Sequence, residues 1–288
     1  MHREINGTGI RVLAVGLGAM PLSIQNRPDE EQAFEVIKTF VEAGGDFIDT
    51  ANVYCLDDSD IGHNERLIAS ALHRLGKKES IVVSTKGGLR RPRGEWVVYG
   101  KPGFLRQSCE RSLRDLQTDC IPLYQLHAVD TNVGLLSTLD ELVQLKSEGK
   151  IAHIGLSNVT PPQVEAALDH TPIASVQNRC NPFEQQDFRN GLIDFCRERG
   201  VAYIPHSPVG GHYGHVRLSQ SELFGRLAQK YGVSRYCIAL AWLLGKGEHI
   251  LPIPGASKPA SIADSLHAIG LRLDSDDMKT IDALPDSP

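Results

Sequence analysis

Four titratable side chains follow short apolar runs in the first half of the chain, and their types suit proton transfer to a carbonyl oxygen. Asp49 ends one run and Tyr54 follows five residues later. Lys86 ends the next run, and His127 ends the one after that. A tyrosine, with an ordinary pKa of about 10, becomes a usable acid when a neighbouring cation lowers that pKa. We therefore expect Lys86 to supply the cation and Asp49 to pair with it, while a neutral His127 donates a hydrogen bond to the carbonyl.

The elements that carry these residues alternate regularly between strand and helix. Between the apolar runs, apolar residues recur at spacings of three and four, as in the segment 33–41, which Gly44 and Gly45 close. The alternation predicts parallel strands joined by right-handed crossovers, and eight such units close a barrel. We therefore expect a single-domain (β/α)₈ TIM barrel, an α/β fold, over residues 1–288. The eight predicted strands are residues 13–16, 47–50, 81–85, 121–126, 153–156, 175–177, 202–205 and 250–253.

A doubly wound open sheet is the alternative architecture. Residues 16–21 contain the first two glycines of a dinucleotide-binding turn but not the third, which weakens that alternative. In a barrel, the carboxyl ends of the strands build the active site, so the four titratable residues converge on one mouth. At the amino terminus, Asn6-Gly7 predicts a hairpin over residues 3–12 that caps the barrel bottom, because these residues readily adopt the positive φ of a tight turn.

In order and placement, Asp49, Tyr54, Lys86 and His127 resemble the catalytic tetrad of the aldo-keto reductase family. The resemblance runs nearly end to end, through residues 16–20, 49–54, 112–127 and 149–158. It implies an NAD(P)H-dependent oxidoreductase that reduces a small aldehyde or ketone, with Tyr54 as general acid. The segments 159–164 and 209–211 are similar to those of bacterial pyridoxal reductases within the family.

The same resemblance implies a set of cofactor contacts. Ser157, Asn158 and Gln177 would hold the nicotinamide carboxamide, and His206 would stack on the nicotinamide where many members have a larger aromatic ring. The full set of implied contacts is Gly18, Met20, Asp49, Ser157, Asn158, Gln177, His206, Ser207, Pro208, Gly255, Ser257, Lys258, Ser261, Asp264 and Ser265.

The adenosine end departs from the family pattern. Ser261, Asp264 and Ser265 stand where many members have Arg, Glu and Asn, which leaves Lys258 as the nearest cation. An arginine grips a ribose 2′-phosphate with two hydrogen bonds, whereas a lysine offers one point charge. We therefore expect NADPH as the preferred cofactor, with NADH as an alternative used at a smaller disadvantage than in other members.

Other functions can be formulated for the same residues. One is a cofactor-binding regulatory subunit with little turnover, and another is a phosphate-binding isomerase or aldolase in which Lys86 forms a Schiff base. The first does not need an intact tetrad, and the second does not need Tyr54. Taken one at a time, each residue also has a structural interpretation. Asp49 could cap a turn, His127 could be a hydrogen-bonded core histidine, and Ser157 could cap backbone groups in a loop.

Composition limits the partners of this 288-residue chain. Its net charge of -5 disfavours nucleic acid or an anionic membrane surface, and its longest apolar run, residues 237–244, is too short for a membrane span. Six scattered cysteines and a polar amino terminus predict a cytoplasmic protein with reduced thiols. No metal site is expected, because His212, Tyr213 and His215 lack a completing ligand. No pattern in the sequence specifies an oligomeric state.

Overall fold

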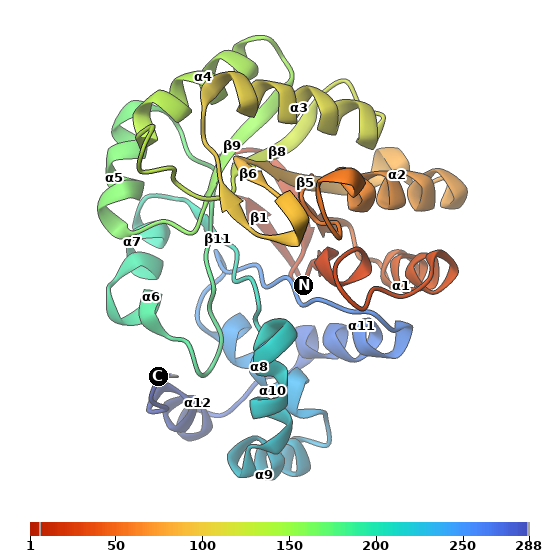
Figure 1. Ribbon diagram of the computed structural model, residues 1–288. Helices are drawn as coiled ribbons and strands as arrows, with labels where there is room; N and C mark the ends of the chain where they lie inside the picture. Colours follow the sequence, from red (N-terminus) through yellow and green to blue (C-terminus); the bar gives the residue numbers. More distant parts are fainter. Residues whose placement is uncertain (6, 287–288) are drawn as a thin grey trace.

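Parallel strands alternate with helices in the computed structural model, and the helices surround the strands (Figure 1). The structure describes residues 1–5 and 7–286, with the backbone alone at residues 212 and 213. Around the ring in Figure 1 the colour passes from red through green to blue, so units that follow one another in sequence lie side by side. This neighbour-by-neighbour order is typical of right-handed βα units.

Seven strands form one parallel sheet in the order β11-β10-β9-β8-β5-β4-β3. Five of the predicted strands match these closely, and the predicted strand 202–205 is shorter in the structure. The first barrel strand lies later than predicted, because Leu13 ends a hairpin strand instead. The seven are β3 (Leu17–Gly18), β4 (Phe47–Asp49), β5 (Val82–Gly87), β8 (Ile121–Leu126), β9 (Ile151–Ser157), β10 (Ser175–Gln177) and β11 (Ala202–Tyr203).

Residues 250–255 close the sheet into a barrel without forming a regular strand. Their two ends bridge in parallel to both edges of the sheet, Ile250 to Tyr203 of β11 and Gly255 to Gly18 of β3. Pro252 and Pro254 lie within this segment and have no N–H to donate, which explains why the predicted eighth strand lacks a regular ladder. The predicted barrel fold is confirmed, with an extended segment in its eighth position.

The helices bury one face each against the strands. In α1, the apolar residues predicted to face the core are buried except Val41, which is partly buried. The Asp29 side chain caps the helix by accepting from the Gln32 N–H at 2.8 Å. The helices are α1 (Glu30–Glu42), α2 (His63–Leu75), α3 (Pro102–Leu116), α4 (Leu135–Ser147), α5 (Pro161–His170), α6 (Gln186–Arg189), α7 (Leu192–Glu198), α8 (Gly211–Gln220), α9 (Glu222–Tyr231), α10 (Arg235–Gly245), α11 (Pro259–Leu266) and α12 (Ser275–Asp282). Short 3₁₀ turns lie at Met20–Leu22, Asp58–Asp60, Lys78–Ser80, Pro92–Gly94 and His267–Gly270. Within the described residues, no helix combines the length and apolarity that a membrane crossing requires.

The amino-terminal hairpin pairs β1 (His2–Ile5) with β2 (Ile10–Leu13) in antiparallel register. Ile5 pairs with Ile10, so four residues separate the two strands. Asn6 lies outside the described residues. Ile5 and Val12 are buried against Phe47 and other residues near the amino-terminal ends of the barrel strands, so the hairpin caps the barrel bottom. A second hairpin pairs β6 (Leu89–Arg90) with β7 (Val97–Val98).

A buried carboxyl group joins α2 to the strand that carries Lys86. Glu65 has no exposed surface, and it accepts a hydrogen bond of 2.6 Å from the Thr85 hydroxyl. Burial raises the pKa of Glu65 to about 7. The folded protein therefore holds this proton more tightly than the unfolded chain does. The stability that this proton provides is complete below the unfolded pKa of about 4.5 and is lost as the pH rises through about 7.

We predict that Glu65→Gln stabilises the protein at alkaline pH, because the uncharged amide avoids ionisation in the core. The unfolding free energy of the variant minus that of wild type should rise by about 3 kcal/mol from pH 4 to pH 8.5. Thermal unfolding at the two pH values measures the change, with Glu42→Gln on the exposed surface of α1 as control. An equal effect of Glu65→Gln at both pH values would contradict the prediction.

Candidate active site

A fully buried ion pair lies inside the barrel between the carboxyl ends of β4 and β5. The Lys86 ammonium donates to both Asp49 carboxylate oxygens, to the Thr50 carbonyl at 2.8 Å and to the Tyr54 hydroxyl at 3.2 Å. The side chains of Lys86 and Asp49 are each 1% exposed. These contacts use the full donor capacity of the ammonium, as a buried charge requires.

Strand register explains how these residues come together. Asp49 is paired with Ser84 of β5, so Lys86 lies one strand repeat further toward the barrel mouth and reaches back to the carboxylate. A tight turn follows β4, in which the Tyr54 N–H donates to the Ala51 carbonyl at 3.0 Å. This turn returns the tyrosine over the end of its own strand.

Burial and the neighbouring charges set the protonation states of this pair. Burial disfavours the Lys86 ammonium, but Asp49 and Tyr54 together raise the pKa of Lys86 above its ordinary value. Burial raises the pKa of Tyr54, and the opposing effect of Lys86 is smaller. The expectation that Lys86 lowers the tyrosine pKa below its ordinary value is therefore wrong as to the net direction. Tyr54 remains a protonated phenol at neutral pH, with a cation beside its oxygen.

His127 faces Tyr54 across the barrel mouth. The two rings lie 5.8 Å apart between centroids at an interplanar angle of 84°. Burial, together with the positive charge of Lys86 and the neighbouring His206, holds the pKa of His127 well below its ordinary value. The imidazole is therefore neutral, and its Nδ1 has no hydrogen-bond partner among the described residues. A neutral imidazole with a free nitrogen can hydrogen-bond a ligand in the mouth.

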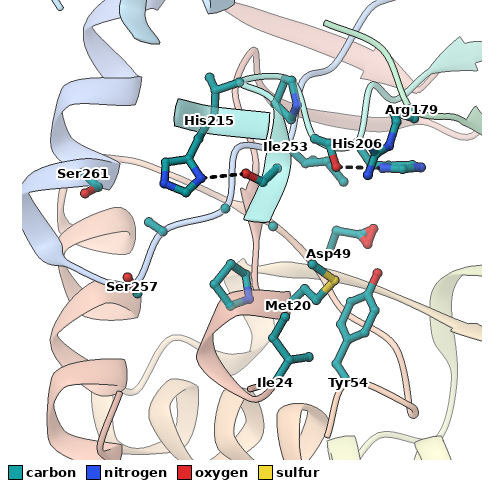
Figure 2. Close-up of a pocket in the computed structure, with 18 of the residues that line it drawn as sticks. Met20, Ile24, Asp49, Tyr54, Arg179, His206, His215, Ile253, Ser257 and Ser261 are labelled. Carbon is teal, nitrogen blue, oxygen red and sulfur yellow. Dashed lines mark hydrogen bonds between the residues drawn. The ribbon is translucent and has the colours of Figure 1, made fainter. Parts of the chain in front are cut away.

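A cavity of about 860 Å³ opens over these residues and extends along the mouth to α11. Figure 2 shows Tyr54 and Asp49 at one end of it and Ser257 and Ser261 at the other. Every predicted site residue lines this cavity except Lys86, which lies beneath Tyr54. The lining members of the predicted set are Gly18, Met20, Asp49, Tyr54, His127, Ser157, Asn158, Gln177, His206, Ser207, Pro208, Gly255, Ser257, Lys258, Ser261, Asp264 and Ser265.

Polar side chains from three adjacent strands meet beside the ion pair. Gln177 donates to Asp49 at 2.6 Å, and the Asn158 amide donates to Ser157 Oγ at 3.1 Å and to the His127 carbonyl at 2.9 Å. Asn158 has a φ of 56°, a left-handed conformation that asparagine tolerates better than most residues. His206 lies beside it, with Nε2 3.4 Å from Asn158 Oδ1. The group presents amide and hydroxyl atoms that match the hydrogen-bonding capacity of a carboxamide.

At the far end of the cavity, the predicted adenosine-binding residues make local hydrogen bonds. Asp264 accepts from the Ser234 hydroxyl at 2.6 Å, and the Ser265 hydroxyl donates to the Ser261 carbonyl at 3.0 Å. Lys258 is the residue at the amino-terminal cap position of α11, and its side chain makes no capping hydrogen bond. Within the described part of the chain it forms no ion pair with a carboxylate.

A polar network that sequence reasoning missed supports the turn after β9. The Asn178 side chain accepts from the Val159 N–H at 3.0 Å and donates to the Val159 carbonyl at 2.7 Å. It also donates to Asp187 at 2.7 Å, and Asp187 accepts from the Tyr203 hydroxyl at 2.7 Å. The network therefore fixes the backbone next to Asn158. The only sequence signal was an asparagine following Gln177 at a strand end.

Two further residues of the cavity wall were also missed. The Trp96 ring centroid lies 6.2 Å from that of Tyr54 and 6.4 Å from that of His127. The Arg91 guanidinium stacks on the indole, with 3.7 Å from its central carbon to the ring centroid. Both residues precede α3 in a segment without apolar periodicity, so the sequence pattern gave no reason to place them at the site.

The histidines after β11 provide no evidence for a metal centre. The side chains of His212 and Tyr213 lie outside what the structure describes, and His215 Nδ1 is 3.1 Å from the Gly211 carbonyl oxygen. Among the described residues, no three His, Cys, Asp or Glu side chains are grouped so as to hold a metal ion.

Comparison with known proteins bears on the site as a whole. The Aldo/keto reductase family model matches residues 14–286. The chain belongs to this family. A probable aldo-keto reductase from Glycine max is 32% identical over 313 residues, which cover 98% of this chain and 88% of that protein. An uncharacterized oxidoreductase from Schizosaccharomyces pombe is 32% identical, over 93% of this chain and 85% of its own length.

Solved structures agree with this assignment. A thermostable aldo-keto reductase crystallised with the inhibitor epalrestat superposes with a TM-score of 0.83 at 28% identity, covering 98% of this chain and 99% of that one. A glycerol dehydrogenase from Gluconobacter oxydans shares the fold with a TM-score of 0.84 at 23% identity, over 98% of this chain and 94% of its own. This chain is thus an NAD(P)H-dependent oxidoreductase, as predicted. The alternative of a regulatory subunit with little turnover gains no support.

We predict that Lys86→Met destabilises this aldo-keto reductase by about 3–5 kcal/mol, because it leaves the Asp49 carboxylate buried without its counter-ion. Burial already raises the pKa of Asp49, and Lys86 is the main group that opposes this rise. The double variant Asp49→Asn/Lys86→Met should recover most of the loss, since it buries no net charge. Urea denaturation measures both, with Lys77→Met at an exposed position as control. If the double variant were as unstable as Lys86→Met alone, the charge argument would fail.

Proposed function

We propose that the chain, as a single domain over residues 1–288, is an NADPH-dependent reductase that converts aldehydes or ketones to alcohols with Tyr54 as general acid. One observation carries the proposal. The Tyr54 hydroxyl lies 3.2 Å from the Lys86 ammonium at the base of the cavity, with the neutral His127 ring opposite. A protonated phenol beside a fixed cation and a second hydrogen-bonding group suits a carbonyl oxygen that gains negative charge.

The residues along the cavity fit a nicotinamide dinucleotide. Ser157, Asn158 and Gln177 offer hydrogen-bonding atoms for a carboxamide next to Tyr54, and Lys258 offers a positive charge at the opposite end for a phosphate. Gly255 is exposed and lines the cavity, and it packs against Pro21 so closely that an added Cβ would lie 2.8 Å from the proline ring, which explains the glycine at this point of the cavity wall. When bound, the reduced cofactor supplies a hydride to the carbonyl carbon.

The protein's own groups then act on the carbonyl oxygen. Tyr54 donates its phenolic proton to that oxygen, and Lys86 stabilises the phenolate that forms. Asp49 holds the ammonium in place through both carboxylate oxygens. His127 orients the carbonyl by a hydrogen bond from its neutral ring, and its lowered pKa makes it a poor proton source. The raised pKa of Tyr54 keeps the proton available across the neutral range.

We predict that wild-type protein oxidises NADPH when aldehydes are added, and that Tyr54→Phe lowers turnover at least about 10²-fold while cofactor affinity is retained. The phenyl ring keeps the packing but lacks the proton. Absorbance of the reduced cofactor and fluorescence titration measure the two quantities. A Tyr54→Phe variant that kept most of its turnover would show that another group is the acid.

We propose broad acceptance of aldehydes, including pyridoxal, which the similarity of residues 159–164 and 209–211 to pyridoxal reductases makes worth testing. A panel of pyridoxal, methylglyoxal and nitrobenzaldehyde separates planar aromatic from small aliphatic preferences. We also place the enzyme in the cytoplasm, since its six cysteines are all free thiols.

We propose that NADPH is preferred over NADH by a modest margin, because the adenosine end has Lys258 but no arginine at Ser261. Asp264 also lines this end and disfavours a second negative group. Ser261→Arg should therefore tighten NADPH binding roughly tenfold to a hundredfold and change NADH binding little. Dissociation constants for both cofactors measure the ratio, with Ser147→Arg on the exposed end of α4 as control. An unmoved ratio would mean that Ser261 does not face the 2′-phosphate.

A further inference from the structure

A second cavity lies at the bottom of the barrel, at the opposite end from Tyr54. It has a volume of about 610 Å³ and is bordered by the hairpin β1–β2, the last turn of α7 and the loop that leads into the segment 250–255. The proposed reaction makes no use of it. We call it the lower cavity, and the residues that form its wall are His2, Arg3, Glu4, Arg11, Arg197, Glu248 and His249.

Arg3 is a buried cation in this wall. It is 6% exposed, whereas its neighbours His2 and Glu4 on the other face of β1 are exposed. The guanidinium donates to the Ile250 carbonyl and, at 2.7 Å, to the Leu244 carbonyl. Burial lowers the pKa of Arg3 to about 10, so the side chain stays positively charged at neutral pH.

Arg3 lacks the partner that a buried charge requires. Both of its hydrogen-bond acceptors are neutral carbonyl groups, and its Nε has no acceptor among the described residues. In the part of the chain that the structure describes, neither Arg3 nor Arg11 forms an ion pair with a carboxylate. A buried cation without a counter-ion is unfavourable, and an anion in the adjoining cavity would relieve this cost.

Two exposed arginines add donors at the rim of the lower cavity. Arg11 lies directly opposite Glu4 in the hairpin register. Arg197 pairs with Asp194 at 2.9 Å, and both of these side chains are more than half exposed. Since ion pairs in water are weak, Arg197 can exchange this partner for a ligand at little cost. Guanidinium groups bind the two oxygens of a carboxylate with parallel hydrogen bonds.

The charge of the wall selects the ligand. Three arginines and two glutamates give a net charge of +1, apart from the two histidines. His249 is neutral, because burial and the charges of Arg197 and Arg3 lower its pKa, and its Nε2 donates to the Ile193 carbonyl at 3.1 Å. A ligand with one negative charge therefore balances the wall, whereas a dianion such as phosphate would also meet repulsion from the glutamates.

We propose that the lower cavity binds a small polar carboxylate, held by the Arg3 guanidinium from inside and by Arg11 and Arg197 at the rim. A hydroxylated carbon chain suits the remainder of the site, since every side chain of the wall is polar or charged. The inference is independent of the proposed function, because none of the wall residues lines the cavity at Tyr54.

The test uses lactate as the probe, titrated into the ¹⁵N-labelled full chain while the arginine Nε–Hε signals are followed by NMR. The signal of Arg3 should shift saturably, with a dissociation constant on the order of 1–10 mM, and it should not move with the uncharged analogue lactamide. Arg3→Lys identifies the signal. This variant keeps the charge but loses the planar fork, so lactate binding, followed by the backbone amides of Glu4 and His249, should weaken on the order of tenfold.

Variants at the rim keep the test valid should Arg3→Lys fail to fold. Arg11→Gln and Arg197→Gln change exposed positions, and each should weaken lactate binding roughly threefold to tenfold. The matched control is Arg226→Gln at an exposed position of α9, which should bind lactate as wild type does. As a second measurement, the thermal midpoint of wild type should rise with lactate concentration more than with sodium chloride at the same ionic strength.

Three results would overturn the inference. The first is an equal shift of the Arg3 signal with lactate and lactamide, or wild-type affinity in both rim variants. The second is tighter binding of inorganic phosphate than of lactate, which would contradict the charge argument. The third is an equal response to chloride, which would reduce the site to an unselective effect of anions.

Discussion

The buried ion pair between Lys86 and Asp49 is the interaction on which the rest of the site depends. Removing two charges from water costs several kcal/mol per ion, and only complete hydrogen bonding with close opposite charge offsets this cost. Lys86 obtains its acceptors from the end of β4 and the turn after it, while Asp49 also accepts from Gln177 at the end of β10. A closed barrel brings these distant strands within reach of one another, because its interior is narrow enough for side chains to meet across it.

The pair also determines how proton transfer can work in a dry interior. Burial alone would keep Tyr54 protonated and would make its phenolate inaccessible. A fixed ammonium at 3.2 Å offsets the second effect without abolishing the first. In the proposed reaction, the phenol would therefore be protonated before the reaction and its phenolate would be stabilised when it forms. Burial and the same ammonium lower the pKa of His127, so in the proposed reaction Tyr54 would supply the proton and His127 would orient the carbonyl.

Strand–helix alternation was sufficient to predict the barrel, and the residue types at strand ends were sufficient to bring Asp49, Tyr54, Lys86 and His127 to one mouth, because parallel strands bring their carboxyl ends together. The other cavity-lining residues were predicted only from the resemblance to the family. Features that depend on contacts between distant segments could not be predicted this way. Asn178 reaches back 19 residues to Val159 and forward to Asp187, and Trp96 meets Tyr54 only through the hairpin that carries it. The net rise in the Tyr54 pKa follows from the depth of burial, which no spacing reveals. The eighth segment lies where it was predicted, but it has no regular ladder of hydrogen bonds because Pro252 and Pro254 have no N–H to donate.

Because of these prolines, the hydrogen bonds between β3 and the segment 250–255 are donated from the β3 side only. We call this junction the seam. Gly16 and Gly18 donate to the carbonyls of Pro252 and Pro254 at 3.0 Å, and the prolines have no N–H to return. A Cβ on Gly18 would lie 2.7 Å from the Ile253 carbonyl oxygen, so a side chain at this position would force the two segments of the seam to separate. Gly18 and Gly255 flank the seam and both line the cavity. In the proposed function, a dinucleotide along the mouth would contact both sides of this junction, and slower amide exchange at Gly16 and Gly18 would then report how far the bound cofactor stabilises the closed barrel.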